Sequence, residues 1–190
     1  MAKHDHIHDP ESMTDEELML GACRGSRNAF ALIVRKHQRG LANFFYSMGV
    51  HNDAEDLTQD TFIKLFKSRG RYRPSAKFTT FLYFVARRIY VDYVRKQARH
   101  KRKIDALAEE TTCAQITEDV SHGEGAEVIE ALQELPEKMR TVVVLNVYEG
   151  LRYQEIADVL GVPLGTVKSR MFSALRRLRE VMVHARTKAI

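Results

Sequence analysis

The chain has 190 residues, 44% of them hydrophobic and 29% charged, with a formal net charge of +5. This length suits one medium domain or two small ones, and the hydrophobic content can sustain a packed core. The sequence lacks both the roughly 18-residue apolar run of a membrane span and the basic-then-apolar start of a signal peptide. We therefore expect a cytoplasmic protein without membrane insertion.

Neither cysteine nor histidine usage predicts a structural or metal site. Cys23 and Cys113 are far apart and no CxxC motif is present, which is not the pattern of a disulfide framework. His4, His6 and His8 alternate and could hold a soft divalent ion. A polar N-terminal tail is more often disordered, so we expect no metal and no cofactor.

The first part of the chain predicts three helices. Thr14 followed by Glu17 is a capping box for a short helix. Ser26 can cap a second helix, and Asn52 offers a cap for a third. In both longer segments the apolar residues recur at helical spacing.

A basic loop, residues 68–77, precedes the longest periodic segment. Apolar residues from Phe78 to Tyr93 form one continuous stripe, which predicts a long amphipathic helix. Aromatic and arginine side chains lie off this stripe, among them Tyr83, Phe84 and Arg87. Aromatic rings beside positive charge suit single-stranded bases. The alternative is that Tyr83 and Phe84 only widen the core.

Charge is strongly segregated along the second half of the chain. Residues 87–103 hold eight basic residues and one acid, and residues 168–188 hold seven basic residues and one acid. Between them, residues 105–137 hold ten acids and no Lys or Arg. Two basic blocks around an acidic connector suggest two contacts with a polyanion, unless each block is merely a solvated helix face.

The last part of the chain predicts a helix-turn-helix. Residues 126–135 and 137–148 read as helices, although the β-branched stretch 141–148 is also compatible with a strand. Ala157 and Gly161 have the spacing of a close helix contact and a turn with positive φ, and Pro163 suits the start of the next helix. That helix points Lys168 and Ser169 outward in its N-terminal half, the part that reads bases in a major groove.

We therefore predict an all-α protein with two small helical domains joined by a flexible acidic linker. The expected boundaries are residues 1–13 for a flexible tail, 14–103 for the first domain, 104–125 for the linker and 126–190 for the helix-turn-helix domain.

Three segments together resemble bacterial sigma factors of the extracytoplasmic-function group (ECF, group IV) of the sigma-70 family. They are DAEDLTQDTFIKLFK at 53–67, FTTFLYFVARRIYVDYVRK at 78–96, and LPEKMRTVVVLNVYEGLRYQEIADVLGVPLGTVKSRM at 135–171. The resemblance implies an alternative sigma factor that is not an enzyme. Such a factor binds core RNA polymerase and directs promoter-specific initiation by reading the −35 duplex and melting the −10 element.

The resemblance also implies roles for individual residues. Core binding, through the β′ clamp helices with further contacts to the β subunit, falls on Asp56, Gln59 and Asp60. Contact with −10 DNA falls on Arg71, Arg73, Lys77, Thr80, Tyr83, Phe84, Arg87, Arg88 and Arg95. Contact with −35 DNA falls on Tyr153, Thr166, Lys168, Ser169, Arg170, Phe172, Ser173 and Arg176. The linker matches the segment that threads the polymerase toward its RNA exit channel, and an anti-sigma factor is the implied regulator.

The chain departs from the family pattern at three positions. Phe81 stands where many members have Trp, Arg88 where many have Asn, and Ser173 where some have Arg.

Two other functions are alternatives to a sigma factor: a stand-alone helix-turn-helix repressor or activator, and a DNA-processing enzyme such as a recombinase. The first gives the acidic and aromatic–basic helices no role, and no side-chain cluster in the sequence suggests an active site for the second.

Overall fold

The computed structural model describes residues 13–74, 76–107 and 126–188, and every regular element within these ranges is helical, as predicted. The expected tail, up to residue 12, and most of the expected linker, residues 108–125, lie outside these ranges, as do the three N-terminal histidines and Cys113. The elements are α1 (Asp15–Cys23), α2 (Arg27–Ser47), α3 (Ala54–Ser68), a 3₁₀ turn η2 (Arg69–Arg71), α4 (Phe78–Leu107), α5 (Ala126–Gln133), α6 (Glu137–Val143), a π-helical turn η3 (Val144–Tyr148), α7 (Tyr153–Leu160) and α8 (Leu164–Lys188).

Two of the three expected caps start their helices. The Thr14 hydroxyl accepts from the Glu17 N–H at 3.2 Å while the Glu17 carboxylate accepts from the Thr14 N–H at 2.8 Å, which completes the capping box. The Ser26 hydroxyl accepts from the Ala29 N–H at 3.2 Å. The third cap was expected at Asn52, but Asp53 occupies the N-cap of α3 without a side-chain cap bond. Its carboxylate instead accepts from the Tyr93 hydroxyl at 2.8 Å.

Helices α1 to α4 form an N-terminal unit around α2. Helix α2 packs against α1 and α3, and α3 packs against α4. The Glu16 carboxylate of α1 accepts from the Phe78 N–H at 2.7 Å, which supplies a partner to the first backbone N–H of α4. The core of this unit is built from large side chains that are almost fully buried: Ile33, Leu41, Phe44, Phe45, Leu65, Phe78 and Leu82.

Helices α5 to α8 form a C-terminal unit in which α8 packs against α5, α6 and α7. The ambiguous segment 141–148 is helical and buries Thr141 to Leu145. Arg140 organises the connection between α5 and α6, because its guanidinium donates to the carbonyl oxygens of Leu132, Gln133 and Leu135 at 2.7–3.0 Å. The consecutive β-branched residues 141–144 thus mark a buried stretch of helix, because neighbouring helices cover it on more than one side.

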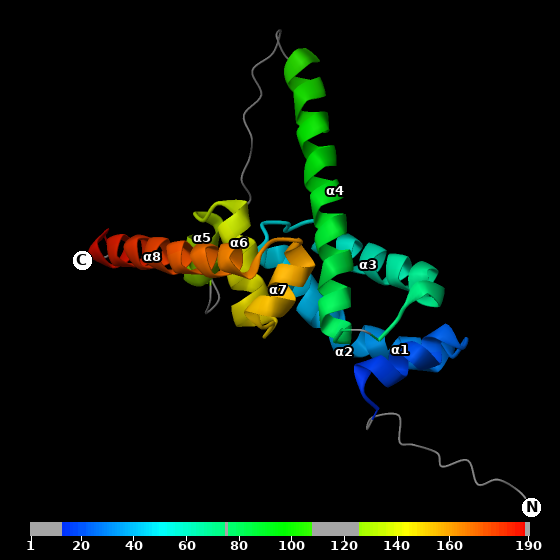
Figure 1. The fold of residues 1–190 in the computed structure, drawn as a ribbon. Coiled ribbons are helices and arrows are strands. Elements are labelled where there is room, and N and C mark those ends of the chain that lie inside the picture. The colour runs from blue at the N-terminus through cyan, green and yellow to red at the C-terminus, as the bar shows by residue number, and fades with distance from the viewer. Residues whose placement is uncertain (1–12, 75, 108–125, 189–190) are drawn as a thin grey trace, which may run out of the picture.

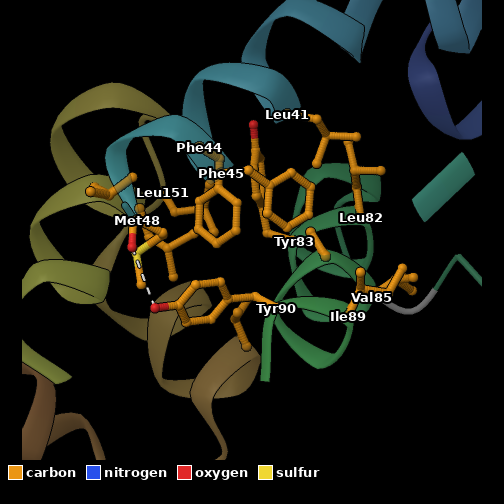
Figure 2. Packing of buried hydrophobic residues seen from close by; sticks show 14 of the residues in the cluster. Leu41, Phe44, Phe45, Met48, Leu82, Tyr83, Val85, Ile89, Tyr90 and Leu151 are labelled. Atoms are coloured by element: carbon orange, nitrogen blue, oxygen red, sulfur yellow. Dashed lines mark hydrogen bonds between the residues drawn. The ribbon is translucent and has the colours of Figure 1, made fainter. Parts of the chain in front are cut away.

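The two units pack against each other, which the sequence did not predict. Helix α4 contacts α7, while α2 contacts α5 and η3. Figure 2 shows the shared core, where Phe44 of α2 and Met48, which directly follows that helix, meet Tyr83 and Tyr90 of α4 beside Leu151 from the C-terminal unit. Helix α4 runs past residue 103, the expected domain end, and its second half projects away from the body of the molecule (Figure 1).

Candidate functional site

Helix α3 presents a polar face to solvent. Its residues Asp56, Gln59 and Asp60 are all exposed, and the next position on that face, Ile63, is exposed as well. The opposite face is held in the core by Leu57, Thr58, Thr61, Phe62 and Leu65. The burial pattern fixes the helix rotation, so the expected polymerase-binding side chains lie together and free of the core.

A groove between α3 and α4 continues this surface. Asp60, Ile63 and Lys64 line it from α3, and Tyr93 and Lys96 line it from α4. It is open to solvent and mixes apolar and charged walls. A surface of this kind fits a protein partner better than a small molecule.

Most of the side chains expected to contact −10 DNA lie at the surface, from η2 and the loop that follows it to the middle of α4. Arg71, Arg73, Lys77, Phe84, Arg88 and Arg95 are exposed, and Arg87 is half-buried. Lys77 is already paired, because its Nζ lies 2.9 Å from the Glu155 carboxylate of α7. Six positive charges and one exposed aromatic ring therefore share this part of the N-terminal unit.

Two of the expected −10 side chains are buried, which contradicts the prediction that they lie off the core face of α4. Thr80 and Tyr83 were expected off the core face, but each exposes less than a tenth of its surface. The Tyr83 ring packs edge-on against Phe44, and its hydroxyl donates to the Glu149 carboxylate. The cause is the C-terminal unit, which gives α4 a second buried face that the periodicity of one helix cannot reveal. In this arrangement the core-packing alternative for Tyr83 is the right one.

The helix-turn-helix has the predicted turn. Gly161 ends α7 with φ 63° and ψ 40°, in the left-handed region, and its N–H donates to the Ala157 carbonyl oxygen. Val167, Met171 and Ala174 bury one face of α8 against the unit. The expected −35 side chains fall on the other faces of α8, except Tyr153, which begins α7. Lys168, Ser169, Phe172 and Arg176 are exposed, whereas Tyr153, Thr166, Arg170 and Ser173 are half-buried.

Glu149 is the most perturbed carboxyl at the contact between the units. Burial raises its pKa from 4.5 to about 7, and the hydrogen bond from Tyr83 opposes that rise. Burial, with the charge of Glu149, also raises the pKa of the Tyr83 hydroxyl above its usual range, so the hydroxyl stays protonated. The backbone comes close here as well, since a Cβ on Gly40 would lie 3.2 Å from the Tyr83 hydroxyl oxygen. Sequence reasoning missed Glu149, because a Glu before a glycine gives no signal of burial.

We expect the Glu149 carboxyl to make stability pH-dependent. Its folded pKa lies above its unfolded value, so the stability linked to its proton is fully present below pH 4.5 and is lost as the pH rises through about 7. Between pH 5 and 8 the loss should be about 1–2 kcal/mol for this partly exposed group. Urea unfolding of wild type and Glu149→Gln at both pH values measures it, since the variant keeps the other titrating groups. Parallel pH profiles for the two proteins would contradict it.

Comparison with known proteins matches each of the two units to a region of one protein family. The family model "Sigma-70 region 2" matches residues 33–100, and "Sigma-70, region 4" matches residues 125–178. An ECF RNA polymerase sigma-E factor of Haemophilus influenzae is 31% identical over 175 residues, which cover 86% of this chain and 93% of that protein. The chain belongs to the extracytoplasmic-function group of the sigma-70 family. Sigma factors of this family are non-catalytic initiation factors, and this chain is an alternative sigma factor that directs promoter-specific transcription with RNA polymerase.

Other sigma factors resemble the chain over most of its length. The RNA polymerase sigma-H factor of Pseudomonas aeruginosa is 33% identical over 84% of this chain and 89% of its own. The solved structure of CnrH, in complex with the cytosolic domain of CnrY, matches with a TM-score of 0.70 at 25% identity, over 90% of this chain and 97% of that one. The sigma factor RpoE of Bartonella quintana, solved with the anti-sigma factor NepR, matches with a TM-score of 0.68 at 25% identity, over 80% and 96%.

Two further observations concern other functions. Within residues 13–74, 76–107 and 126–188, no helix combines the length and apolar character that a membrane crossing requires. In the same part of the chain, no three His, Cys, Asp or Glu side chains gather as a metal site would need.

Proposed function

We propose that the two units divide the work of initiation. Residues 14–103 act as the region 2 domain, with α3 docking on core polymerase and the start of α4 holding the −10 element. Residues 126–190 act as the region 4 domain, with α8 reading the −35 duplex. The exposure of the α8 side chains directly after the Gly161 turn supports this best, because Lys168, Ser169 and Phe172 are free to enter a major groove.

The proposal also covers where in the cell the chain acts and which kind of protein regulates it. The chain acts in the cytoplasm in this proposal, because its proposed partners are core polymerase and promoter DNA. An anti-sigma factor is the third partner, because the solved sigma factors that resemble this chain include one bound to the anti-sigma factor NepR.

We expect α3 to carry much of the affinity for core polymerase. The double variant Asp56→Ala/Gln59→Ala removes two exposed polar groups from one face, and loss of one charge-assisted contact costs about 1.5–3 kcal/mol. A fluorescence titration with core polymerase should therefore show affinity at least tenfold weaker. Gln38→Ala/Glu134→Ala, an exposed pair on α2 and just after the end of α5, is the control and should bind as wild type does. Equal affinities for the two double variants would remove α3 from the interface.

The side chains of α8 should divide into those that bind the DNA backbone and those that recognise the bases of the −35 element. Lys168→Ala should weaken binding to all promoters alike and lower the salt slope by about one unit, because a lysine meets phosphate. Ser169→Ala should change the preferred −35 bases, at about 1–3 kcal/mol for each base pair read. Selection from a library with a randomised −35 element, with holoenzyme containing each protein, measures both effects. Identical preferences for wild type and Ser169→Ala would show that Ser169 is not a reader.

A gel shift with and without core polymerase tests the function as a whole. We expect stable promoter complexes only when core is present. Strong sequence-specific binding by the chain alone would instead favour a stand-alone helix-turn-helix regulator.

A further inference from the structure

The second half of α4 leaves the core and extends into solvent (Figure 1). Tyr93 and Val94 still pack against the core, whereas every residue from 95 to 104 is exposed. These residues make about three helical turns, so all sides of the helix face solvent there. We call residues 96–104 the basic arm.

The basic arm carries positive charge around its whole circumference. Because a helix turns once in about 3.6 residues, its cations are spread over several sides and do not form one stripe. None of them forms an ion pair with a residue that the structure describes. The arm contains no acidic residue, and its five Lys and Arg residues are Lys96, Arg99, Lys101, Arg102 and Lys103.

This concentration of charge is unfavourable for the helix in the free chain. The four neighbours of Arg99 at i±3 and i±4 are Arg95, Lys96, Arg102 and Lys103, and all four are cations. Like charges at this spacing destabilise a helix. The arm is exposed throughout, so burial does not offset the repulsion. A polyanion beside the arm would relieve it.

The side chains of the arm suit duplex DNA better than a single strand or an acidic protein. Single-stranded bases stack on aromatic rings, but the arm contains no Phe, Tyr or Trp. A protein interface has an apolar centre, and Ile104 is the only large apolar residue of the arm. Duplex DNA carries one phosphate charge for about every 1.7 Å of its axis, which complements a dense group of cations.

We propose that the basic arm binds the phosphate backbone of duplex DNA without reading its sequence. Phosphate contacts hold a protein on a duplex but carry no sequence information. The contact needs neither a promoter nor core polymerase, so it goes beyond the proposed function. It gives the chain a hold on DNA that is separate from the side chains of α8.

Fluorescence anisotropy of the full chain with a short labelled duplex of scrambled sequence, over a series of salt concentrations, tests the proposal. We expect wild type to bind, with log K falling linearly with log[salt]. Lys101→Ala/Arg102→Ala/Lys103→Ala should lower this slope by about three units and weaken binding at low salt about tenfold. Alanine is the strongest helix former, so the variant keeps the helix. An unchanged slope would overturn the proposal.

A matched control separates the arm from net charge. Arg27→Ala/Arg35→Ala/Arg39→Ala removes the same number of charges from exposed positions of α2 and leaves the arm intact. It should change the slope by less than about one unit. The basic residues of α8 are present in both variants, so the difference between them reports the arm. Equal changes in the two variants would overturn the proposal and leave net charge as the cause.

Competitors and a single-stranded probe identify the partner. Polyglutamate at the same concentration of charge should displace the labelled duplex much less than unlabelled duplex does. The arm variant should also lose less affinity for a labelled single strand than for the duplex. Equal displacement by polyglutamate would overturn the proposal in favour of an acidic protein partner. Equal losses for single strand and duplex would overturn the preference for duplex.

Hydrogen exchange followed by mass spectrometry locates the contact. The amides of the arm should exchange rapidly in the free chain, because no packing covers them, and several-fold more slowly with the scrambled duplex bound. Peptides from α2 should exchange at the same rate in both states. Binding that leaves the exchange of the arm unchanged would overturn the proposal. Such a failure leaves the proposed function standing, because the DNA probe contains no promoter.

Discussion

Replacing Phe44 with alanine should lower the free energy of unfolding by about 3–5 kcal/mol. The Phe44 side chain is fully buried, and its ring packs edge-on against Phe45 and Tyr83, with centroids 5.3 and 5.5 Å apart. It lies where α2, α4 and the C-terminal unit meet (Figure 2). Truncation leaves a cavity that none of these helices can fill alone. Urea unfolding followed by circular dichroism measures the loss.

Phe172→Ala is the matched control, because the Phe172 ring on α8 is 71% exposed. Its removal should change the unfolding free energy by less than about 0.5 kcal/mol. Comparable losses for the two variants would mean that Phe44 does not occupy the shared core.

Valine at position 161 should destabilise the helix-turn-helix by about 2–3 kcal/mol and abolish −35 binding. A Cβ on Gly161 would meet no atom within 4 Å, so crowding is not the reason. The backbone is the reason, because φ 63° is a conformation that a β-branched residue rarely adopts. Thermal unfolding and a −35 duplex gel shift with holoenzyme report the two effects.

Gly165 provides the comparison within the same motif. A Cβ there also meets nothing within 4 Å, but the residue lies in the first turns of α8 with ordinary helical backbone. Gly165→Ala should therefore be neutral or stabilise the unit by up to about 1 kcal/mol. If Gly161→Ala and Gly165→Ala had the same effect, backbone strain would not be the cause.

Local signals in the sequence predicted the local structure well. Thr14 and Ser26 cap their helices, and Gly161 makes the predicted turn, because each effect depends on residues a few positions apart. The exposed face of α3 followed from the periodicity of its buried face. At Asn52 the local rule was wrong, because Asp53, which takes the N-cap, is engaged by Tyr93 from another helix.

The contact between the two units could not be predicted in this way. Tyr83 and Thr80 lie off the main apolar stripe of α4. Tyr83 packs against Phe44 of α2 and bonds to Glu149 of the C-terminal unit, while Thr80 lines a hollow beside Asp158 and Val159 of α7. The burial of Glu149 could not be predicted from the residues next to it in the sequence, because it depends on Tyr83 and other residues of the N-terminal unit. Family resemblance assigns roles to residues by their position in the sequence. It does not show which of those residues are buried when the two units pack together.

The hydrogen bonds of the Arg140 guanidinium fall unequally on the two units. Four of the five go to atoms of its own unit and one goes to the carbonyl oxygen of Met48, the residue that follows α2. A buried charge that loses its partners is strongly destabilising. Arg140 depends on α2 for only one of its five partners, so the folding of the C-terminal unit around this charge needs little from the N-terminal unit.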